Sequence, residues 1–398
     1  MNRRHLLKTL AIAPLAAQFG GHAGRLFAAP AGTPRCLVVF LRGGYDASSL
    51  LVPVSSNFYY QSRPNIAIPK PSEDLRTAIA LDADWGLHPA LRDSIHPLFR
   101  NGQAAFLPFA GTDDLTRSHF ETQDSIELGQ PLTGTRNFRS GFMNRLAAVL
   151  NGAAPIALTD QLPIAMQGEV QVPNIALRSV GRPNVDARQS KIIASMYGDT
   201  PLAAQVNEGF MVREDVARQF AGEMDAANRN AITAKGFELE ARRIARLMRD
   251  KYTLGFVDVG GWDTHVGQGA ASGYLAGRFD ELGRGLAGFA DEMGPQWRDT
   301  VVVVISEFGR TFRENGNRGT DHGHGSVYWL LGGGIRGGRV VGEQQRLEQA
   351  TLFQNRDYPV LNEYRAVLGG LFGRMYGLRA EQVERVFVQT RPKDIGLV

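Results

Sequence analysis

The stretch CLVVFLRGGYD (36–46) decides the fold class, because it carries an unbroken apolar run straight into a glycine-bearing polar turn. Apolar runs of this length without alternation indicate strands that are covered on both faces, as in a parallel sheet. Three further runs repeat the pattern and also end in polar turns. These runs cover residues 104–109, 254–259 and 301–305.

Helical segments with apolar residues at helical spacing lie between these predicted strands. Strands that alternate with helices predict an α/β domain with a mostly parallel central sheet and helices on both faces. Gly236 can interrupt the longest helical segment, and residues 156–180 leave open either extra strands or an inserted cap. The predicted helices cover residues 89–99, 214–249, 274–293 and 361–376.

Residues 32–398 contain no internal repeat, low-complexity tract or linker, so the sequence predicts one continuous domain. Four of the 44 Lys and Arg residues lie in residues 1–31, which hold no Asp or Glu, so the rest of the chain has 40 residues of each sign. This balance argues against a nucleic-acid partner held by a basic surface. The single cysteine, Cys36, excludes an internal disulfide.

Residues 1–31 have the order of parts that is typical of an export signal: a basic start, an apolar stretch over 9–17 and small residues before a cleavage site at Ala31. The run NRRHLLK (2–8) matches the twin-arginine consensus. An ordinary secretory signal is the alternative, but the lysine that ends this run and the break at Pro14 favour the twin-arginine pathway. We therefore predict that the twin-arginine export machinery carries the chain to a periplasmic or extracellular location. The apolar stretch is too short for a membrane span, which needs about 20 residues.

Six histidines follow residue 31, and four of them stand in short polar motifs after predicted strands. Imidazole nitrogens and carboxylate oxygens are the ligands that borderline and hard divalent metals prefer. In open α/β sheets, ligands bind beyond the carboxyl ends of the strands. A single histidine is more often structural, whereas four such motifs together indicate a functional site. The four residues are His119, His265, His322 and His324.

Five motifs in this order resemble the signatures of the domain of unknown function 1501 family, whose members commonly carry twin-arginine signals. That family is placed in the alkaline-phosphatase-like superfamily with sulfatases and phosphopentomutases. The resemblance spans nearly all of the chain after the signal, and it implies an alkaline-phosphatase-like α/β fold. The motifs are GGYD (43–46), SHF (118–120), GGWDTH (260–265), SEFGRT (306–311) and DH (321–322).

The resemblance also implies a set of site residues. Ser118, at a helix start, matches the nucleophile, with Thr116 as the alternative, and His119 and Arg310 complete the implied catalytic group. Arg310 is either a salt-bridge partner or a guanidinium that holds an anionic substrate. The implied metal ligands are Asp46, Asp263, His265, Glu307, and a late histidine that is either His322 or His324.

Two departures from the superfamily pattern bear on the implied chemistry. Phe308 stands where the second metal of the phosphatases has a histidine ligand, so the resemblance implies one divalent ion (zinc, manganese or calcium) rather than two. No Cys-x-Pro-x-Arg segment surrounds Cys36, so the formylglycine nucleophile of sulfatases is absent.

The same residues also have structural interpretations. Asp46 can cap a tight glycine turn. Asp263 and His265 can form a hydrogen-bonded pair, and Glu307 can cap the turn after its strand, although burying a carboxylate there is costly. These alternatives stay open at the level of the sequence.

The sequence leads to two hypotheses of function. The first is an exported, divalent-metal-dependent hydrolase of phosphate, sulfate or related esters that acts on an anionic small molecule or a glycan. The second is a non-catalytic binding protein of the cell envelope on the same fold, with or without a metal. The metal content of the exported protein distinguishes them.

Replacing Arg3 and Arg4 by lysine is expected to block export and to leave a folded precursor in the cytoplasm, because the twin-arginine pathway reads the arginine pair. Fractionation of cells that express the wild type and the variant measures this directly. Undiminished export of the variant would show that the general secretory route is sufficient.

Overall fold

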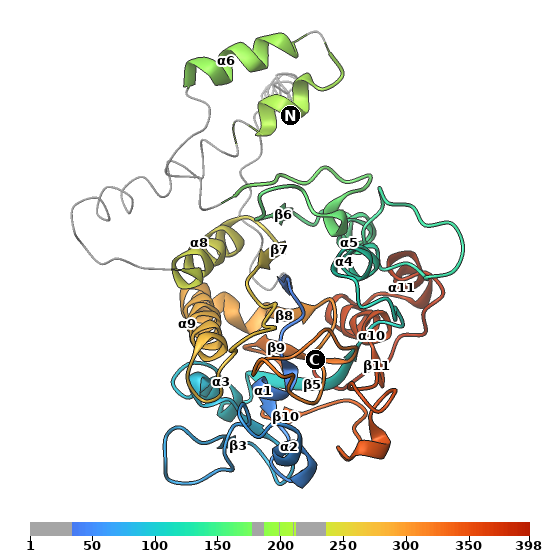
Figure 1. The fold of residues 1–398 in the computed structure, drawn as a ribbon. Helices are drawn as coiled ribbons and strands as arrows, with labels where there is room; N and C mark the ends of the chain where they lie inside the picture. Colours follow the sequence, from blue (N-terminus) through green and yellow to red (C-terminus); the bar gives the residue numbers. More distant parts are fainter. Residues whose placement is uncertain (1–33, 177–186, 199, 210, 212–235) are drawn as a thin grey trace, which may run out of the picture.

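The computed structural model describes residues 34–176, 187–198, 200–209, 211 and 236–398 (Figure 1). The predicted signal, residues 1–31, lies outside the described residues, as do residues 214–235 of the longest predicted helix. Within the described part of the chain, no helix is long and apolar enough to cross a membrane.

An eight-stranded sheet forms the centre, in the order β10-β5-β9-β8-β1-β7-β6, with β11 beside β5. All described pairs in this sheet are parallel except those of β9 with β5 and β8. The mostly parallel α/β prediction is therefore confirmed. The strands are β1 (Arg35–Leu41), β5 (Ala104–Gly111), β6 (Pro155–Ala157), β7 (Leu254–Val259), β8 (Thr300–Ser306), β9 (Ser326–Gly332), β10 (Arg339–Val340) and β11 (Asn362–Glu363).

Side chains of β1 alternate between two hydrophobic cores, which explains why its sequence is apolar throughout. Leu37 and Val39 belong to one core, and Val38 and Phe40 to the other. Helices α8 (Phe237–Asp250) and α9 (Tyr274–Met293) cover the first face of the sheet. Helices α4 (His119–Leu128), α5 (Phe142–Leu150), α10 (Tyr364–Tyr376) and α11 (Ala380–Val386) cover the second face (Figure 1).

The predicted helices agree with the structure to different degrees. Residues 274–293 coincide with α9, and Gly236 is the N-cap of α8, with a φ of 77°. Residues 89–99 divide into a short 3-10 turn and α3 (Ile95–Arg100). Further helices are α1 (Ala47–Leu50), α2 (Asn57–Ser62) and α6 (Ala187–Met196), and β2 (Leu51–Val52), β4 (Gly86–Leu87) and β3 (Ile79–Ala80) form a second small sheet.

The main addition to the predicted topology is β9, which runs antiparallel between β5 and β8. In the region left open by the sequence, β6 is an extra strand beside β7. The carboxyl ends of β1, β7 and β8 lie at the same edge of the sheet, because these strands are parallel and in register. The loops that carry the candidate site residues therefore project from that edge.

The buried side chain of His88 makes the stability of the fold depend on pH. Its Nδ1 accepts a hydrogen bond from the Ala90 N–H at 3.1 Å, and its Nε2 donates to the Ala270 carbonyl at 3.0 Å, so the ring is neutral. Burial lowers the pKa of His88 from 6.5 to about 4. Because the folded-state pKa is the lower one, the neutral ring stabilises the fold above pH 6.5, and this contribution is lost as the pH falls towards 4.

We expect the free energy of unfolding contributed by His88 to fall by about 2 kcal/mol between pH 7 and pH 5. The variant His88→Gln keeps a donor and an acceptor but does not titrate. Its free energy of unfolding should therefore fall by about 2 kcal/mol less than that of the wild type between pH 7 and pH 5. Urea unfolding of both proteins at the two pH values measures the difference. An equal decline in both would contradict the assignment.

Candidate metal centre

Three loops at the carboxyl edge of the sheet bring together one aspartate and three histidines. Asp263 and His265 follow β7, His119 opens α4, and His322 lies between β8 and β9. Ligand atoms of His119, Asp263 and His322 all lie within 4.8 Å of one another. We refer to His119, Asp263, His265 and His322 as the histidine–aspartate cluster.

The Asp263 carboxylate faces the Nε2 atoms of all three imidazoles. Its Oδ1 lies 2.9 Å from Nε2 of His265 and 3.3 Å from Nε2 of His322. Its Oδ2 lies 3.6 Å from Nε2 of His119. The Nε2 atoms of His265 and His322 are themselves only 3.1 Å apart. Four potential ligand groups therefore converge on one small volume.

Each histidine of the cluster is held from behind through its other ring nitrogen. Nδ1 of His119 donates to Glu307 Oε1 at 2.8 Å, and Nδ1 of His265 donates to Asp321 Oδ1 at 3.1 Å. Nδ1 of His322 donates to the carbonyl of Arg117 at 3.0 Å. Because carboxylates and carbonyls only accept, these contacts place a proton on each Nδ1 and turn each Nε2 towards Asp263. Metal-binding histidines in proteins are held in this way.

The electrostatics of the cluster favour an anionic carboxylate at Asp263. Burial opposes ionisation of Asp263, but the hydrogen bond from Arg310 and the neighbouring histidines outweigh it and lower the pKa of Asp263. Burial, with the charges of His119 and Arg310, lowers the pKa of His322. The hydrogen bond to Glu307 raises the pKa of His119. The side chains of Asp263 and His265 are 45% and 41% exposed, so the cluster is open to solvent.

Arg310 fixes the position of Asp263 from the protein interior. Its buried guanidinium donates through Nη2 to an Asp263 oxygen and to the Gly43 carbonyl, the latter at 2.7 Å. It also donates to the carbonyls of Gly44 and Thr320. These bonds occupy the donors that a substrate anion would need. In the structure, Arg310 therefore orients Asp263 rather than facing the solvent.

The Gly43–Gly44 turn is required for this packing. Gly43 has a φ of +124°, and a Cβ there would come within 2.7 Å of the Asp263 nitrogen. Gly44 has a φ of +61°, and a Cβ there would overlap the ring of Phe308. That ring packs against both His119 and His322, with centroids 5.0 Å apart in each pair. Phe308 thus supports the imidazoles from the side.

Asp46 and Glu307, two predicted metal ligands, lie in other environments. Asp46 is buried and paired with Arg63 at 2.5 Å, and Ser49 and Gln268 also donate to its carboxylate. The buried Glu307 accepts hydrogen bonds from His119, from the Gly43 N–H and from other polar groups. Both carboxylates are already satisfied by protein donors. Glu307 reaches the cluster through His119.

Ser118 and His324 occupy the margins of the site. Ser118 is the partly exposed N-cap residue of α4, directly before His119, and its side chain makes no capping hydrogen bond. His324 packs against the ring of Phe353, and burial lowers its pKa to about 4. It is not one of the residues grouped around Asp263.

Asp321 and the Arg117 carbonyl are site groups that the sequence did not assign. The sequence pattern could have indicated Asp321, because it directly precedes His322 in the motif DH (321–322). Its contact with His265 joins two loops that lie far apart in the sequence. The Arg117 carbonyl could not be identified from the sequence, because every residue has a backbone carbonyl and this contact uses no atom of the Arg117 side chain. Backbone acceptors of this kind are found only once the fold is known.

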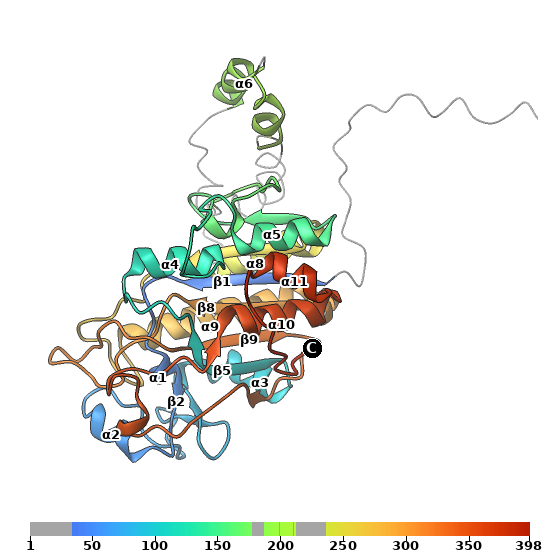
Figure 2. The same cartoon turned by 90° about the vertical axis from the view of Figure 1, so that its right-hand side faces the viewer.

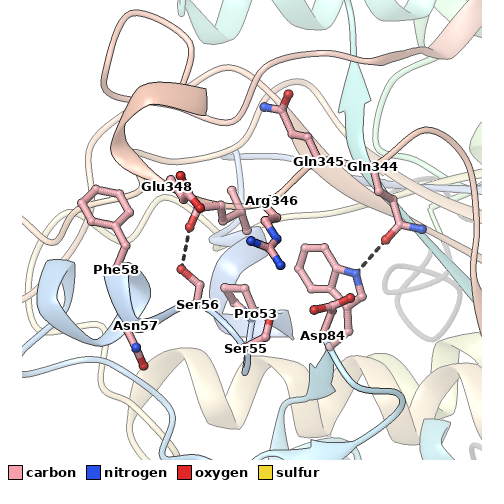
Figure 3. A pocket seen from close by; sticks show the side chains of 12 residues that line it. Pro53, Ser55, Ser56, Asn57, Phe58, Asp84, Gln344, Gln345, Arg346 and Glu348 are labelled. Carbon is pink, nitrogen blue, oxygen red and sulfur yellow. Dashed lines mark hydrogen bonds between the residues drawn. The ribbon is translucent and has the colours of Figure 1, made fainter.

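A groove of about 600 Å³ lies elsewhere, between the start of α2 and residues 344–348 (Figure 3). Its walls combine amide, hydroxyl and charged side chains such as Asn57 and Arg346 with apolar ones such as Phe58 and Trp85. It is lined by none of the predicted site residues, so it is separate from the histidine–aspartate cluster.

The family model described as "Protein of unknown function (DUF1501)" matches residues 33–387. The chain therefore belongs to this family, as its motifs predicted. No curated protein matches the chain.

Several solved structures resemble the chain at low sequence identity. "Ps i-CgsB in complex with k-i-k-neocarrahexaose" has a TM-score of 0.38 and 9% identity, over 92% of this chain and 75% of that one. The PsFucS1 sulfatase from Pseudoalteromonas sp. has a TM-score of 0.34 and 13% identity, over 77% of this chain and 64% of that one. A protein in the alkaline phosphatase superfamily from Vibrio parahaemolyticus has a TM-score of 0.32 and 12% identity, over 77% of this chain and 61% of that one.

Proposed function

We propose that the histidine–aspartate cluster binds one divalent metal ion and that the chain is a metal-dependent hydrolase of phosphate, sulfate or related esters. One observation carries the proposal: three imidazoles, each held through Nδ1 by an acceptor, direct their Nε2 atoms at the same carboxylate. Two such nitrogens 3.1 Å apart would share a cation favourably. The ligands would be His119, Asp263, His265 and His322.

The donor set suits zinc or manganese better than calcium. Three imidazole nitrogens and one carboxylate are typical ligands of borderline transition metals, whereas calcium takes six to eight oxygen ligands. A second metal has no ligand set in this proposal, because protein donors already occupy Asp46 and Glu307. Phe308 contributes only an apolar ring to the same region.

A bound metal ion would polarise an ester oxygen and lower the pKa of a coordinated hydroxyl or water. The chain itself would supply positioning and a nucleophile. Ser118 stands at the amino end of α4, where the helix dipole favours an anion, and it is the nucleophile that we propose. Glu307 and Asp321 would fix the tautomers of His119 and His265, and Arg310 would act as a positioning residue for Asp263.

We further propose that residues 1–31 are a twin-arginine-type signal and that the hydrolase acts outside the cytoplasm. The support is the order of the basic, apolar and small-residue parts in the sequence. The mature chain would then be one domain over residues 32–398.

The purified protein is expected to hold about one zinc or manganese ion and to hydrolyse 4-nitrophenyl phosphate or sulfate slowly. A chelator should abolish the activity, and added metal should restore it. His265→Ala should weaken metal affinity by more than about tenfold, since it removes a ligand. Ser118→Ala should lower the rate and leave the metal content unchanged. Elemental analysis and rate measurements on the same samples test both points.

His96→Ala is the matched control, because His96 lies on α3 outside the cluster. It should change neither metal content nor rate. A metal-bound wild type without hydrolytic activity would favour the non-catalytic binding protein. Full metal content in the His265→Ala variant would contradict the proposed ligand set.

A further inference from the structure

The residue before the proposed nucleophile has a strained backbone. Arg117 has a φ of +53°, in the left-handed region that residues with a side chain adopt only at a cost in free energy. Its carbonyl accepts the hydrogen bond from Nδ1 of His322, and Ser118 and His119 follow it directly at the start of α4. The start of α4 and the loop between β8 and β9 lie at the same end of the sheet (Figure 2). The backbone conformation of Arg117 therefore affects His322, Ser118 and His119 together.

A buried carboxylate holds the side chain of Arg117. Oδ2 of Asp357 accepts a hydrogen bond from Nε of Arg117 at 3.0 Å and another from its Nη2 at 2.8 Å. The Asp357 side chain is 0% exposed, whereas that of Arg117 is 23% exposed. Oε1 of Gln354 accepts a third bond from Nη2 of Arg117 at 2.7 Å. Strained conformations persist only where the surrounding structure holds them, and these three bonds hold Arg117.

The backbone of Asp357 belongs to the same scaffold as that of His322. Asp357 pairs with Thr311 in an antiparallel bridge, and His322 pairs in the same way with Arg310. Both residues are thus anchored to neighbouring positions after β8. Arg117 is tied to this scaffold twice, by its side chain through Asp357 and by its carbonyl through His322.

We infer that Asp357 is a positioning residue of the metal centre, which acts through Arg117 on the ring of His322. Its ion pair holds Arg117 in the left-handed conformation and so keeps the carbonyl of Arg117 against Nδ1 of His322. The consequence for metal binding rests on the proposed function, in which Nε2 of His322 is a ligand. Without the ion pair, the Arg117 backbone would relax, and Nε2 of His322 would lose its fixed direction towards Asp263.

The first readout is the exchange with water of the Nδ1–H proton of His322, followed by NMR in zinc-free protein labelled with 15N-histidine. Its signal is the one that a His322→Gln variant lacks. In the wild type, the hydrogen bond to the Arg117 carbonyl should protect this proton. Asp357→Asn keeps the size of the side chain but removes its charge, and should speed the exchange by about tenfold or more.

Two substitutions of Arg117 separate the ion pair from the backbone strain. Arg117→Ala removes the ion pair from its more exposed side and keeps the strain, so it should also speed the exchange by about tenfold or more. Arg117→Gly removes the ion pair as well, but glycine adopts a φ of +53° without strain. Its exchange rate should therefore stay closer to that of the wild type.

The second readout is zinc affinity, measured by competition with a chromophoric chelator. Asp357→Asn and Arg117→Ala should each weaken it by about threefold to tenfold, because they loosen a group that orients a ligand, and Arg117→Gly should weaken it less. Asp394→Asn is the matched control. It removes an Asp–Arg pair, with Arg374 at 2.8 Å, outside the three loops of the cluster, and should change neither readout.

The two readouts separate this inference from the proposed function. A wild type that binds no zinc, with exchange rates in the expected order, would support the positioning role and contradict the proposed function. Unchanged exchange in Asp357→Asn and Arg117→Ala would overturn the inference, whatever the zinc affinity. So would the lack of a protected Nδ1–H signal in the wild type, or equal acceleration by Arg117→Ala and Arg117→Gly.

Discussion

The buried guanidinium of Arg310 is the interaction on which the proposed site depends. It joins the turn after β1, the loop after β7 and the segment around Thr320 through hydrogen bonds to backbone carbonyls and to Asp263. A buried charge is tolerated only when its donors are satisfied and a partner charge is present, and Arg310 meets both conditions. A Cβ at Gly43 would clash with the backbone of Asp263, and a Cβ at Gly44 with the ring of Phe308, so the turn that presents these carbonyls to Arg310 requires glycine at both positions.

The sheet and the hydrogen bonds around the imidazoles make separate contributions to the geometry of the cluster. Parallel strands deliver the loops with Asp263 and His265 and the loop with His322 to one edge. Acceptors behind each ring then set its tautomer, and Phe308 limits the movement of two of the rings. In the proposed centre, the Nε2 atoms would be oriented before a cation binds, which would lower the free-energy cost of binding it.

The sequence alone predicted the structural features that depend on local residue patterns. Continuous apolar runs predicted β1, β5, β7 and β8, because strands covered on both faces cannot alternate. The polar residues after these runs included the whole histidine–aspartate cluster, although His119 was assigned to catalysis rather than to metal binding. Long-range pairing was not predictable. Nothing in the sequence around Arg63 indicated that its guanidinium would pair with Asp46, and the antiparallel strand β9 has the same apolar pattern as its parallel neighbours.

Anomalous diffraction at the zinc edge, from crystals of the zinc-loaded protein, would locate an ion bound by the histidine–aspartate cluster. We expect one strong peak within coordination distance, about 2.0–2.2 Å, of Nε2 of His119, His265 and His322 and of an Asp263 oxygen. The buried carboxylate of Asp46 should remain paired with Arg63 and carry no peak. A peak at Asp46, or the absence of a peak among the three imidazoles, would contradict the proposed ligand set.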